Sequence, residues 1–455
     1  MASEHTRTTT STPTRTAAAT EPPRAATHAW RTRLLMAGIV LAALNLRPAI
    51  TSLGALLEEV RDGLGMSGST AGLLTSVPPL CFAVFGVTAP RLARRFGPGA
   101  VVCAGMVAIT TGLLIRPYTG GTAGFLAASA LALMGIAVSN VLMPVIIKRH
   151  FPDRVGSMTG LYSMALALGT SSAAALTVPL TGALGGGWRP GLALWAALAA
   201  AAVLPWLAFV RQRRGAPGTA GTAPGLAGTA PGLAGAAPGP AGSALGEPAA
   251  PHARVERPDG PRITRSRTAW ALAVFFGLQA TAAYITMGWM AQIFRDAGVS
   301  AGESGLLLAV TMAMGVPLAY VIPRVASRLP QQGPIAVVLG VCGLVGYAGL
   351  YLAPAGGAWA WAVLLGVANC AFPLALTMVG MRARTGAGVA RLSAFAQSAG
   401  YLISMPGPLL VGVLYQHSGG WGLPLALMAA LMLPQMAAGV LAGRPGTVED
   451  ESAAR

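Results

Sequence analysis

Long apolar segments recur along the chain, and short polar segments separate them. Each is about 20 residues or longer, the length an α-helix needs to cross a hydrocarbon layer of ~30 Å. The segments are continuously apolar, whereas strands of a membrane barrel alternate apolar and polar residues. The pattern therefore predicts an all-α membrane protein with about twelve transmembrane helices. These segments lie near residues 33–57, 70–90, 98–116, 121–147, 156–184, 190–210, 268–293, 303–323, 334–353, 357–381, 390–415 and 421–442.

Two long segments lack this pattern. Residues 1–29 are rich in Thr, Ala, Pro and Arg, and residues 211–267 repeat Ala-Pro-Gly and Leu-Ala-Gly units between arginines. Neither composition can bury a core, so we expect a disordered tail and a flexible linker. The predicted domains are a tail (1–29), an N-terminal six-helix bundle (30–210), a linker (211–267), a C-terminal six-helix bundle (268–443) and a second tail (444–455).

The composition favours the membrane class and argues against a nucleic-acid partner. Hydrophobic residues make up 54% of the chain and charged residues 10%, against about 25% charged in soluble domains. The formal net charge is +17, but the basic residues lie in short groups between apolar segments rather than in a patch with interleaved aromatics. All four cysteines fall inside apolar segments without metal-ligand spacing, so we expect small buried side chains there and no metal or other cofactor.

The basic residues also predict an orientation, because cytoplasmic loops of membrane proteins are enriched in Lys and Arg. The richer side includes both termini and the linker, which we therefore place in the cytoplasm. The predicted protein is a multi-pass protein of the plasma (inner) membrane. The richer loops hold Arg91, Arg94, Arg95, Lys148, Arg149, Arg154, Arg324, Arg328, Arg382, Arg384 and Arg391, and the poorer ones hold Arg61, Arg116, Arg189 and Arg295.

The two predicted bundles repeat each other in sequence. Four pairs of landmarks are separated by 229 to 234 residues (for example, 295 − 61 = 234). Both halves enter from the same side, so the repeat is parallel, with a site expected near the midplane between the halves. The pairs are Arg61-Asp62 with Arg295-Asp296, Pro90-Arg91 with Pro323-Arg324, Asn140-x-x-x-Pro144 with Asn369-x-x-x-Pro373, and Gly186-Gly187-Trp188 with Gly419-Gly420-Trp421.

The segment from Gly86 to Arg95 resembles the signature loop of the major facilitator superfamily, although Pro90 and Ala93 replace the usual acid and second glycine. The segments Leu44–Ile50, Ala71–Thr75, Pro90–Gly97 and Thr159–Tyr162 further resemble the cyanate/2-nitroimidazole transporter family of that superfamily. The resemblance implies a secondary carrier for a small anion or a nitro-substituted azole. It also implies a gating role for Gly86, Arg91, Arg94, Arg95, Arg324 and Arg328 at the cytoplasmic face.

Arg47 is the most informative candidate for the substrate site. It lies near the middle of the first apolar segment, where a charge costs at least ~2.5–3.5 kcal/mol and usually faces a cavity or a partner. No Asp or Glu lies in the interior of any apolar segment. A guanidinium facing a central cavity favours a delocalised anion or a nitro group, because its planar fork suits two oxygen ligands. The alternative is an arginine that only satisfies backbone carbonyls, and Pro48 is expected to loosen the helix beside it.

Further polar residues fall on helices that surround the cavity in this fold. Asn140 and Asn369 are equivalent positions, each four residues before a proline, and either substrate contact or interhelical hydrogen bonding fits them. Gln397 and Tyr401 lie one turn apart and therefore share a face. The predicted substrate-binding set is Arg47, Asn45, Asn140, Tyr162, Gln279, Tyr284, Asn369, Gln397 and Tyr401.

The sequence leaves the coupling ion and the direction of transport open. We find no nucleophile, paired-carboxylate or histidine constellation that would indicate an enzyme, and no Walker loop for ATP hydrolysis. We expect a monomer that acts on a small-molecule substrate in the lipid bilayer. A multidrug-type exporter of the same fold, a channel and a membrane-embedded enzyme remain as alternatives.

Overall fold

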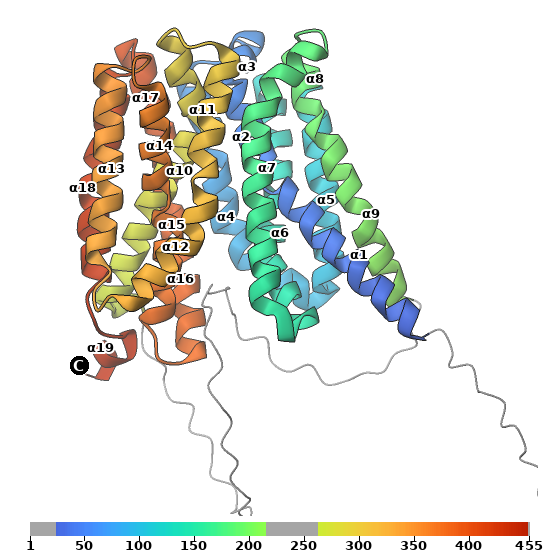
Figure 1. Cartoon of the computed structure of the whole chain (residues 1–455). Helices are drawn as coiled ribbons and strands as arrows, with labels where there is room; N and C mark the ends of the chain where they lie inside the picture. Colours follow the sequence, from blue (N-terminus) through green and yellow to red (C-terminus); the bar gives the residue numbers. More distant parts are fainter. Residues whose placement is uncertain (1–23, 215–262, 454–455) are drawn as a thin grey trace, which may run out of the picture.

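The computed structural model describes residues 24–214 and 263–453. In these residues twelve helical segments are long and apolar enough to cross a membrane, which confirms the predicted fold class. Figure 1 shows the segments standing upright in two groups, one from each half of the chain. Residues 24–29, which we assigned to the tail, are helical; the rest of that tail and most of the predicted linker lie outside the described residues.

The N-terminal half contains nine α-helices in the described part of the chain. These are α1 (Arg24–Asn45), α2 (Pro48–Ala55), α3 (Leu57–Leu64), α4 (Gly68–Phe96), α5 (Pro98–Ile115), α6 (Thr122–His150), α7 (Val155–Ala183), α8 (Trp188–Ala193) and α9 (Trp195–Arg214).

The C-terminal half repeats this arrangement and adds a short helix at its end. Its helices are α10 (Arg267–Asp296), α11 (Ala301–Ala313), α12 (Gly315–Arg328), α13 (Gly333–Leu352), α14 (Ala358–Asn369), α15 (Ala371–Met381), α16 (Gly386–Ser404), α17 (Pro406–Ser418), α18 (Gly422–Ala442) and α19 (Val448–Ala453).

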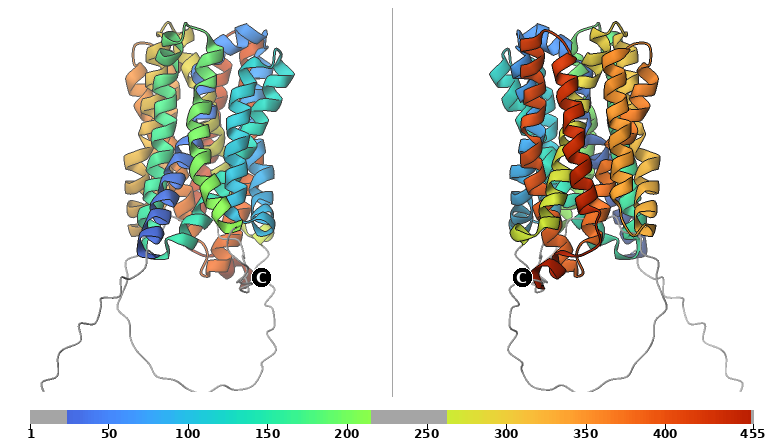
Figure 2. Two further views of the ribbon diagram at one scale, coloured as in Figure 1. Left: turned by 90° about the vertical axis from the view of Figure 1, so that its right-hand side faces the viewer. Right: turned by 90° about the vertical axis from the view of Figure 1, so that its left-hand side faces the viewer.

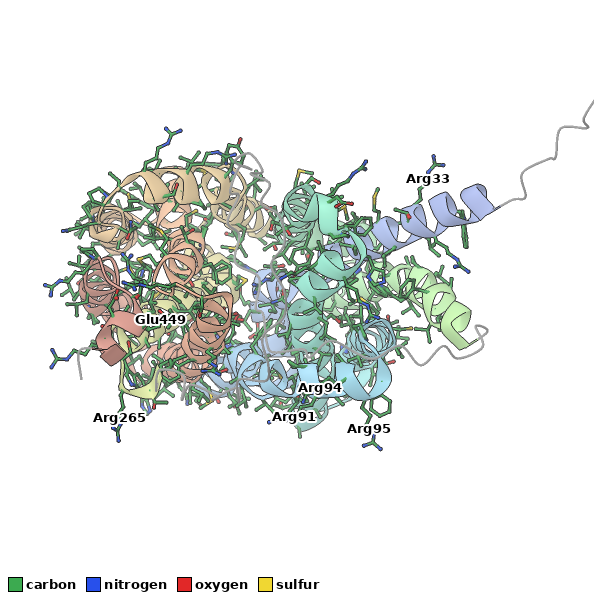
Figure 3. The ribbon with its side chains drawn as sticks, turned by 90° about the horizontal axis from the view of Figure 1, so that it is seen from below. Arg33, Arg91, Arg94, Arg95, Arg265 and Glu449 are labelled. Atoms are coloured by element: carbon green, nitrogen blue, oxygen red, sulfur yellow. The ribbon has the colours of Figure 1, made fainter. Side chains whose placement is uncertain are left out.

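The helix packing repeats between the halves, as the sequence repeat predicts. Helix α1 packs against α7 and α9, and its counterpart α10 packs against α16 and α18. Seen along the helices, the blue and green N-terminal half lies beside the yellow and red C-terminal half (Figure 3). A site between the halves is therefore built from both copies of the repeat.

The bundle has two ends, which we name by what lies there. At the linker end α9 ends and α10 begins, and α19 lies at this end too (Figures 1 and 2). At the α3 end lie α3, α8 and the start of α11 (Figure 1). Large apolar side chains such as Leu204 (67% exposed) and Leu352 (79% exposed) cover the outside of the bundle. Such exposure is typical of a surface that contacts lipid rather than water.

Several spans are broken near their middle. The first span is interrupted at Leu46 and Arg47, and α2 starts with Pro48, which supplies no N–H and whose ring clashes with the preceding turn. The eleventh span breaks before Pro406, as the Pro-Gly-Pro sequence indicates. The two equivalent Asn-Pro segments differ, because α14 ends at Asn369 whereas α6 continues through Asn140 to His150.

The two halves contact each other closely toward the α3 end. Helix α2 packs on α10 and α11, α4 packs on α17, and α7 packs on α11. At Gly54 the backbones approach so closely that a Cβ atom would lie 1.9 Å from the Met287 carbonyl oxygen. Trp289 Nε1 donates a hydrogen bond of 3.2 Å to Thr75 Oγ1 across the same interface. The structure is therefore closed at the α3 end.

Candidate substrate site

Arg47 occupies the break between α1 and α2, where it is the N-cap residue of α2. Its side chain is half-buried, and its Cζ atom lies 5.9 Å from the centroid of the Phe82 ring on α4. Within the described residues no carboxylate forms an ion pair with Arg47. The structure therefore holds a cation near the middle of the bundle without a protein counter-charge, in the position that the sequence indicates.

Three tyrosines gather around this guanidinium from three different helices. The charge of Arg47 acts on the hydroxyl groups of Tyr162 on α7, Tyr284 on α10 and Tyr401 on α16, and Arg47 also makes a hydrogen-bond interaction with Tyr284. All three side chains are buried. The sequence-predicted residues Arg47, Tyr162, Tyr284 and Tyr401 are thus brought together by helices of both halves.

Phe82 completes this group and was missed by the sequence analysis. Its ring stacks on Tyr401 with centroids 5.2 Å apart and lies 6.5 Å from the ring of Tyr284. An apolar residue in an apolar helix gives no sequence signal for such a role. We call Arg47, Phe82, Tyr162, Tyr284 and Tyr401 the Arg47 cluster. It combines a guanidinium, hydroxyl groups and aromatic faces, which suits a flat or linear ligand with a negative oxygen or nitrogen.

The two equivalent asparagines lie near the cluster in different ways. Asn140 Oδ1 accepts a hydrogen bond of 2.5 Å from the Tyr162 hydroxyl, so it orients a cluster residue. Gln279 Nε2 donates a bond of 3.4 Å to the Asn369 carbonyl oxygen. Gln279 Oε1 and Asn369 Nδ2 are buried and have no hydrogen-bond partner in the described chain. Such atoms are rare in folded proteins and are available to a ligand.

Two predicted site residues are engaged elsewhere. Asn45 Nδ2 donates hydrogen bonds to the carbonyl oxygens of Leu41 (2.7 Å) and Leu198 (3.1 Å), so Asn45 fastens α1 to α9 rather than joining the Arg47 cluster. Gln397 Nε2 donates to Ser393 Oγ one turn earlier on α16, at 2.8 Å. A substrate contact of Asn45 therefore stays a prediction, and in this structure its side chain is bonded toward α9.

The predicted gating residues lie on helices and not in loops. Helix α4 continues past Gly86 to Phe96 and is ended by Gly97, whose φ of +84° favours glycine. Arg91, Arg94 and Arg95 therefore project from its last turns at the linker end (Figure 3). Arg324 and Arg328 lie on α12, and the Arg324 guanidinium stacks on the Tyr320 ring, 3.1 Å from its centroid. A gating role for all six residues stays a prediction.

Arg116 and Arg382 are buried arginines in the described chain, 2% and 4% exposed, and of these Arg116 lies toward the α3 end. The sequence analysis assigned it to a loop, yet its side chain is 2% exposed. Its Nη1 atom donates to the Ala49 carbonyl oxygen at 2.9 Å, and its Nη2 atom donates to Ser52 Oγ at 3.4 Å. The only sequence feature that could have indicated this burial is that Arg116 directly follows the apolar segment, with no polar residue between them.

The duplicated twelve-span fold and the cluster between its halves define a class of membrane transporter. The sequence profile of the Major Facilitator Superfamily matches residues 34–390. The fold resembles the D-xylose–proton symporter (TM-score 0.64, 12% identity, covering 92% of this chain and 99% of that one) and the nucleoside transporter NupG (TM-score 0.66, 11% identity, covering 90% and 98%). The chain belongs to the major facilitator superfamily and is a transporter.

More specific relatives confirm the resemblance found in the sequence. The chain is 32% identical to the uncharacterized transporter YycB of Bacillus subtilis (strain 168), over 90% of this chain and 93% of the relative. It is 32% identical to the 2-nitroimidazole transporter of Escherichia coli (strain K12), over 90% and 95%. It is 28% identical to the cyanate transport protein CynX of Escherichia coli (strain K12), over 88% and 94%.

Proposed function

We propose that this protein is a secondary transporter that carries a small anion, such as cyanate, or a nitro-substituted azole by alternating access. The observation that carries the proposal is Arg47 itself, a cation in a helix break between the halves without a carboxylate partner in the described chain. A central charge of this kind costs several kcal/mol unless a ligand or a polar cavity offsets the cost. An anionic ligand would supply that compensation during transport.

The neighbours of Arg47 narrow the substrate class. Tyrosine hydroxyls donate hydrogen bonds to oxygen or nitrogen acceptors, and the Phe82 and Tyr401 rings offer a flat aromatic surface. A linear anion uses the guanidinium and the hydroxyls, whereas a nitro-azole uses its nitro oxygens on Arg47 and stacks its ring on the aromatic faces. Both ligands match the names of relatives at 28–32% identity.

The closed α3 end supports a carrier over a channel, because a carrier occludes its path on one side at a time. Counterflow tests this directly. Purified protein is reconstituted in liposomes loaded with unlabelled cyanate or 2-nitroimidazole, and entry of the labelled compound is followed. A carrier gives a transient accumulation above equilibrium that needs the internal compound. Equilibration without such an overshoot, for both compounds, would refute the proposed mechanism and substrate class.

We further propose that the protein acts as a monomer in the plasma membrane, with the linker end in the cytoplasm. The basic residues at that end, including Arg91, Arg94 and Arg95 (Figure 3), support this orientation. In a cysteine-free background, a membrane-impermeant thiol reagent applied to whole cells is expected to modify Gly186→Cys at the α3 end and to spare Gln331→Cys at the linker end. The reverse pattern would invert the orientation.

A further inference from the structure

A small cavity lies between the Arg47 cluster and the α3 end. Both halves line it: Arg116, Ser129 and Thr75 come from the N-terminal half, and Tyr284 and Gly288 from the C-terminal half. Its volume is about 20 Å³, which is room for one or two water-sized groups. Tyr284 belongs to the Arg47 cluster as well, so the cluster and the cavity adjoin at this residue.

Arg116 brings a full positive charge to this cavity with only neutral partners. In the described chain it forms no ion pair, and its contacts are a carbonyl oxygen, a hydroxyl and the Phe125 ring, 5.9 Å from the guanidinium carbon. The Nε atom is buried and has no hydrogen-bond partner there. Neutral partners offset little of the cost of burying an ionised group. Arg116 therefore keeps an unused N–H donor and an uncompensated charge in the part of the chain that the structure describes.

Ser129 supplies a second donor on the same cavity. Its side chain is 1% exposed, and its Oγ atom has no hydrogen-bond partner in the part of the chain that the structure describes. Two buried groups with unused hydrogen-bonding capacity, one of them a cation, thus line one small space. A purely structural arginine would not explain the unpartnered hydroxyl beside it.

From this geometry we propose that Arg116 and Ser129 form a second binding site for a small monovalent anion, on the path between the Arg47 cluster and the α3 end. The inference rests on the proposed function and extends it to a two-site path. Because both halves line the cavity, a separation of the halves at the α3 end would widen it. The anion then passes from one guanidinium to the next around the Tyr284 side chain.

Equilibrium binding of [14C]cyanate to the purified full-length protein, measured by scintillation proximity with gluconate as the balancing anion, tests the site. We expect about two cyanates per wild-type protein at saturation, and about one for each of Arg116→Gln and Arg47→Gln. Arg189→Gln is the matched control, because Arg189 is an exposed arginine at the same end that donates to the Pro117 carbonyl oxygen. It should still bind about two.

Ser129→Ala separates a binding role from a structural one. The hydroxyl has no partner to lose among residues 24–214 and 263–453, so the melting temperature without anion should stay at the wild-type value. The affinity of one of the two sites should fall about tenfold, since a hydrogen bond to an ion is lost. Unchanged cyanate binding in Ser129→Ala overturns the site. So does an Arg116→Gln protein that melts earlier but still binds two cyanates per folded molecule.

The same experiment keeps this inference distinct from the proposed function. Loss of one cyanate in Arg116→Gln but none in Arg47→Gln supports the second site and removes the central one. Loss in Arg47→Gln alone does the opposite and overturns the inference. Replacing gluconate by chloride shows which anions the second site accepts. Displacement of one cyanate in the wild type and none in Arg116→Gln shows that the site also takes inorganic anions. No displacement in either protein shows that the site prefers the substrate. Either chloride result supports the site.

Discussion

Arg295 on α10 binds the carboxylate of Glu59 on α3, with its Nη1 atom 2.9 Å from each carboxylate oxygen, although the residues are 236 positions apart. Its Nε atom also lies 2.9 Å from Glu58 Oε2. The counterpart of Arg295 in the repeat is Arg61, which instead stacks 5.4 Å from the centroid of the Tyr415 ring. Both arginines of the repeated Arg-Asp pair therefore join the halves at the α3 end, by different interactions.

Arg295→Gln should loosen this closure. The partners are 18–38% exposed, so the pair is expected to contribute about 0.2–1 kcal/mol, up to about a fivefold change in the closed-to-open ratio. In a cysteine-free protein, Leu53→Cys on the buried wall of the cavity should react up to about fivefold faster with a thiol reagent applied at the α3 end. Arg189→Gln is the control of equal charge. Unaltered reactivity would show that the pair does not hold the halves together.

Gly54→Ala should have a larger effect than loss of the ion pair. The added Cβ would meet the Met287 carbonyl oxygen at 1.9 Å, and a backbone atom on another helix cannot rotate away. We expect the closed state to be lost, with Leu53→Cys reactivity raised more than about tenfold and counterflow abolished. Gly302→Ala at the same end is the control, because nothing lies within 4 Å of its added Cβ. Normal counterflow in Gly54→Ala would contradict alternating closure at this contact.

The sequence predicted the twelve spans, the duplication and Arg47, because continuous apolar length, repeated landmarks and a mid-span charge are local signals. It could not show that Tyr162, Tyr284 and Tyr401 meet, since that depends on how two halves pack. The sequence could also not show that Asn45 bonds toward α9 rather than toward the Arg47 cluster. In a continuous α-helix, Asn45 and Arg47 would lie about 200° apart around the axis, because they are two positions apart. Asn45 faces α9, and the helix breaks at Arg47.

Arg116 shows a different limit of the sequence pattern, because it lies in the connection between α5 and α6, as predicted, but its side chain is buried. An arginine at the end of an apolar segment is expected to be exposed, because long basic side chains commonly extend toward the membrane surface. Here the side chain extends inward and binds the first turn of α2 instead. The sequence contains the residue but not the direction of its side chain, which depends on how α2 packs beside the end of α5.

The C-terminal helix α19 should stabilise the C-terminal half in a pH-dependent way. Glu451 accepts hydrogen bonds from Thr268 N (3.2 Å) and Oγ1 (2.5 Å) at the start of α10, and Asp450 forms an ion pair with Arg384 at 2.5 Å. Burial alone would raise the pKa of Glu451, but bonds from Thr268 and Ser266 lower it below its ordinary value of 4.5. A hydrogen bond from Thr447 lowers the pKa of Asp450 below 3.8, and Arg384 adds to this.

Since the folded-state pKa values are depressed, this stabilisation is present above pH 4.5 and lost as the pH falls through the folded values. Glu451→Gln should cost roughly 0.5–2 kcal/mol at pH 7, as loss of a helix cap does, and the difference in melting temperature from the wild type should shrink in acid. Glu303→Gln, an exposed glutamate at the α3 end, is the control. A difference that persists unchanged at acid pH would exclude the carboxylate as its source.

Arg47 offers the sharpest test of the substrate site. Arg47→Lys keeps the charge but loses the planar fork that binds two acceptor atoms, so counterflow of cyanate should fall about tenfold or more, as expected for a charged hydrogen bond worth about 1.5–3 kcal/mol.

Arg47→Ala removes the charge together with its burial cost. It should therefore leave the melting temperature without ligand at or above that of the wild type, and abolish the rise in melting temperature that ligand binding gives. If Arg47 only braces the helix break, the unliganded protein would melt earlier and the folded fraction would bind cyanate normally. Normal affinity in Arg47→Ala would transfer the site to the unpartnered amide atoms of Gln279 and Asn369.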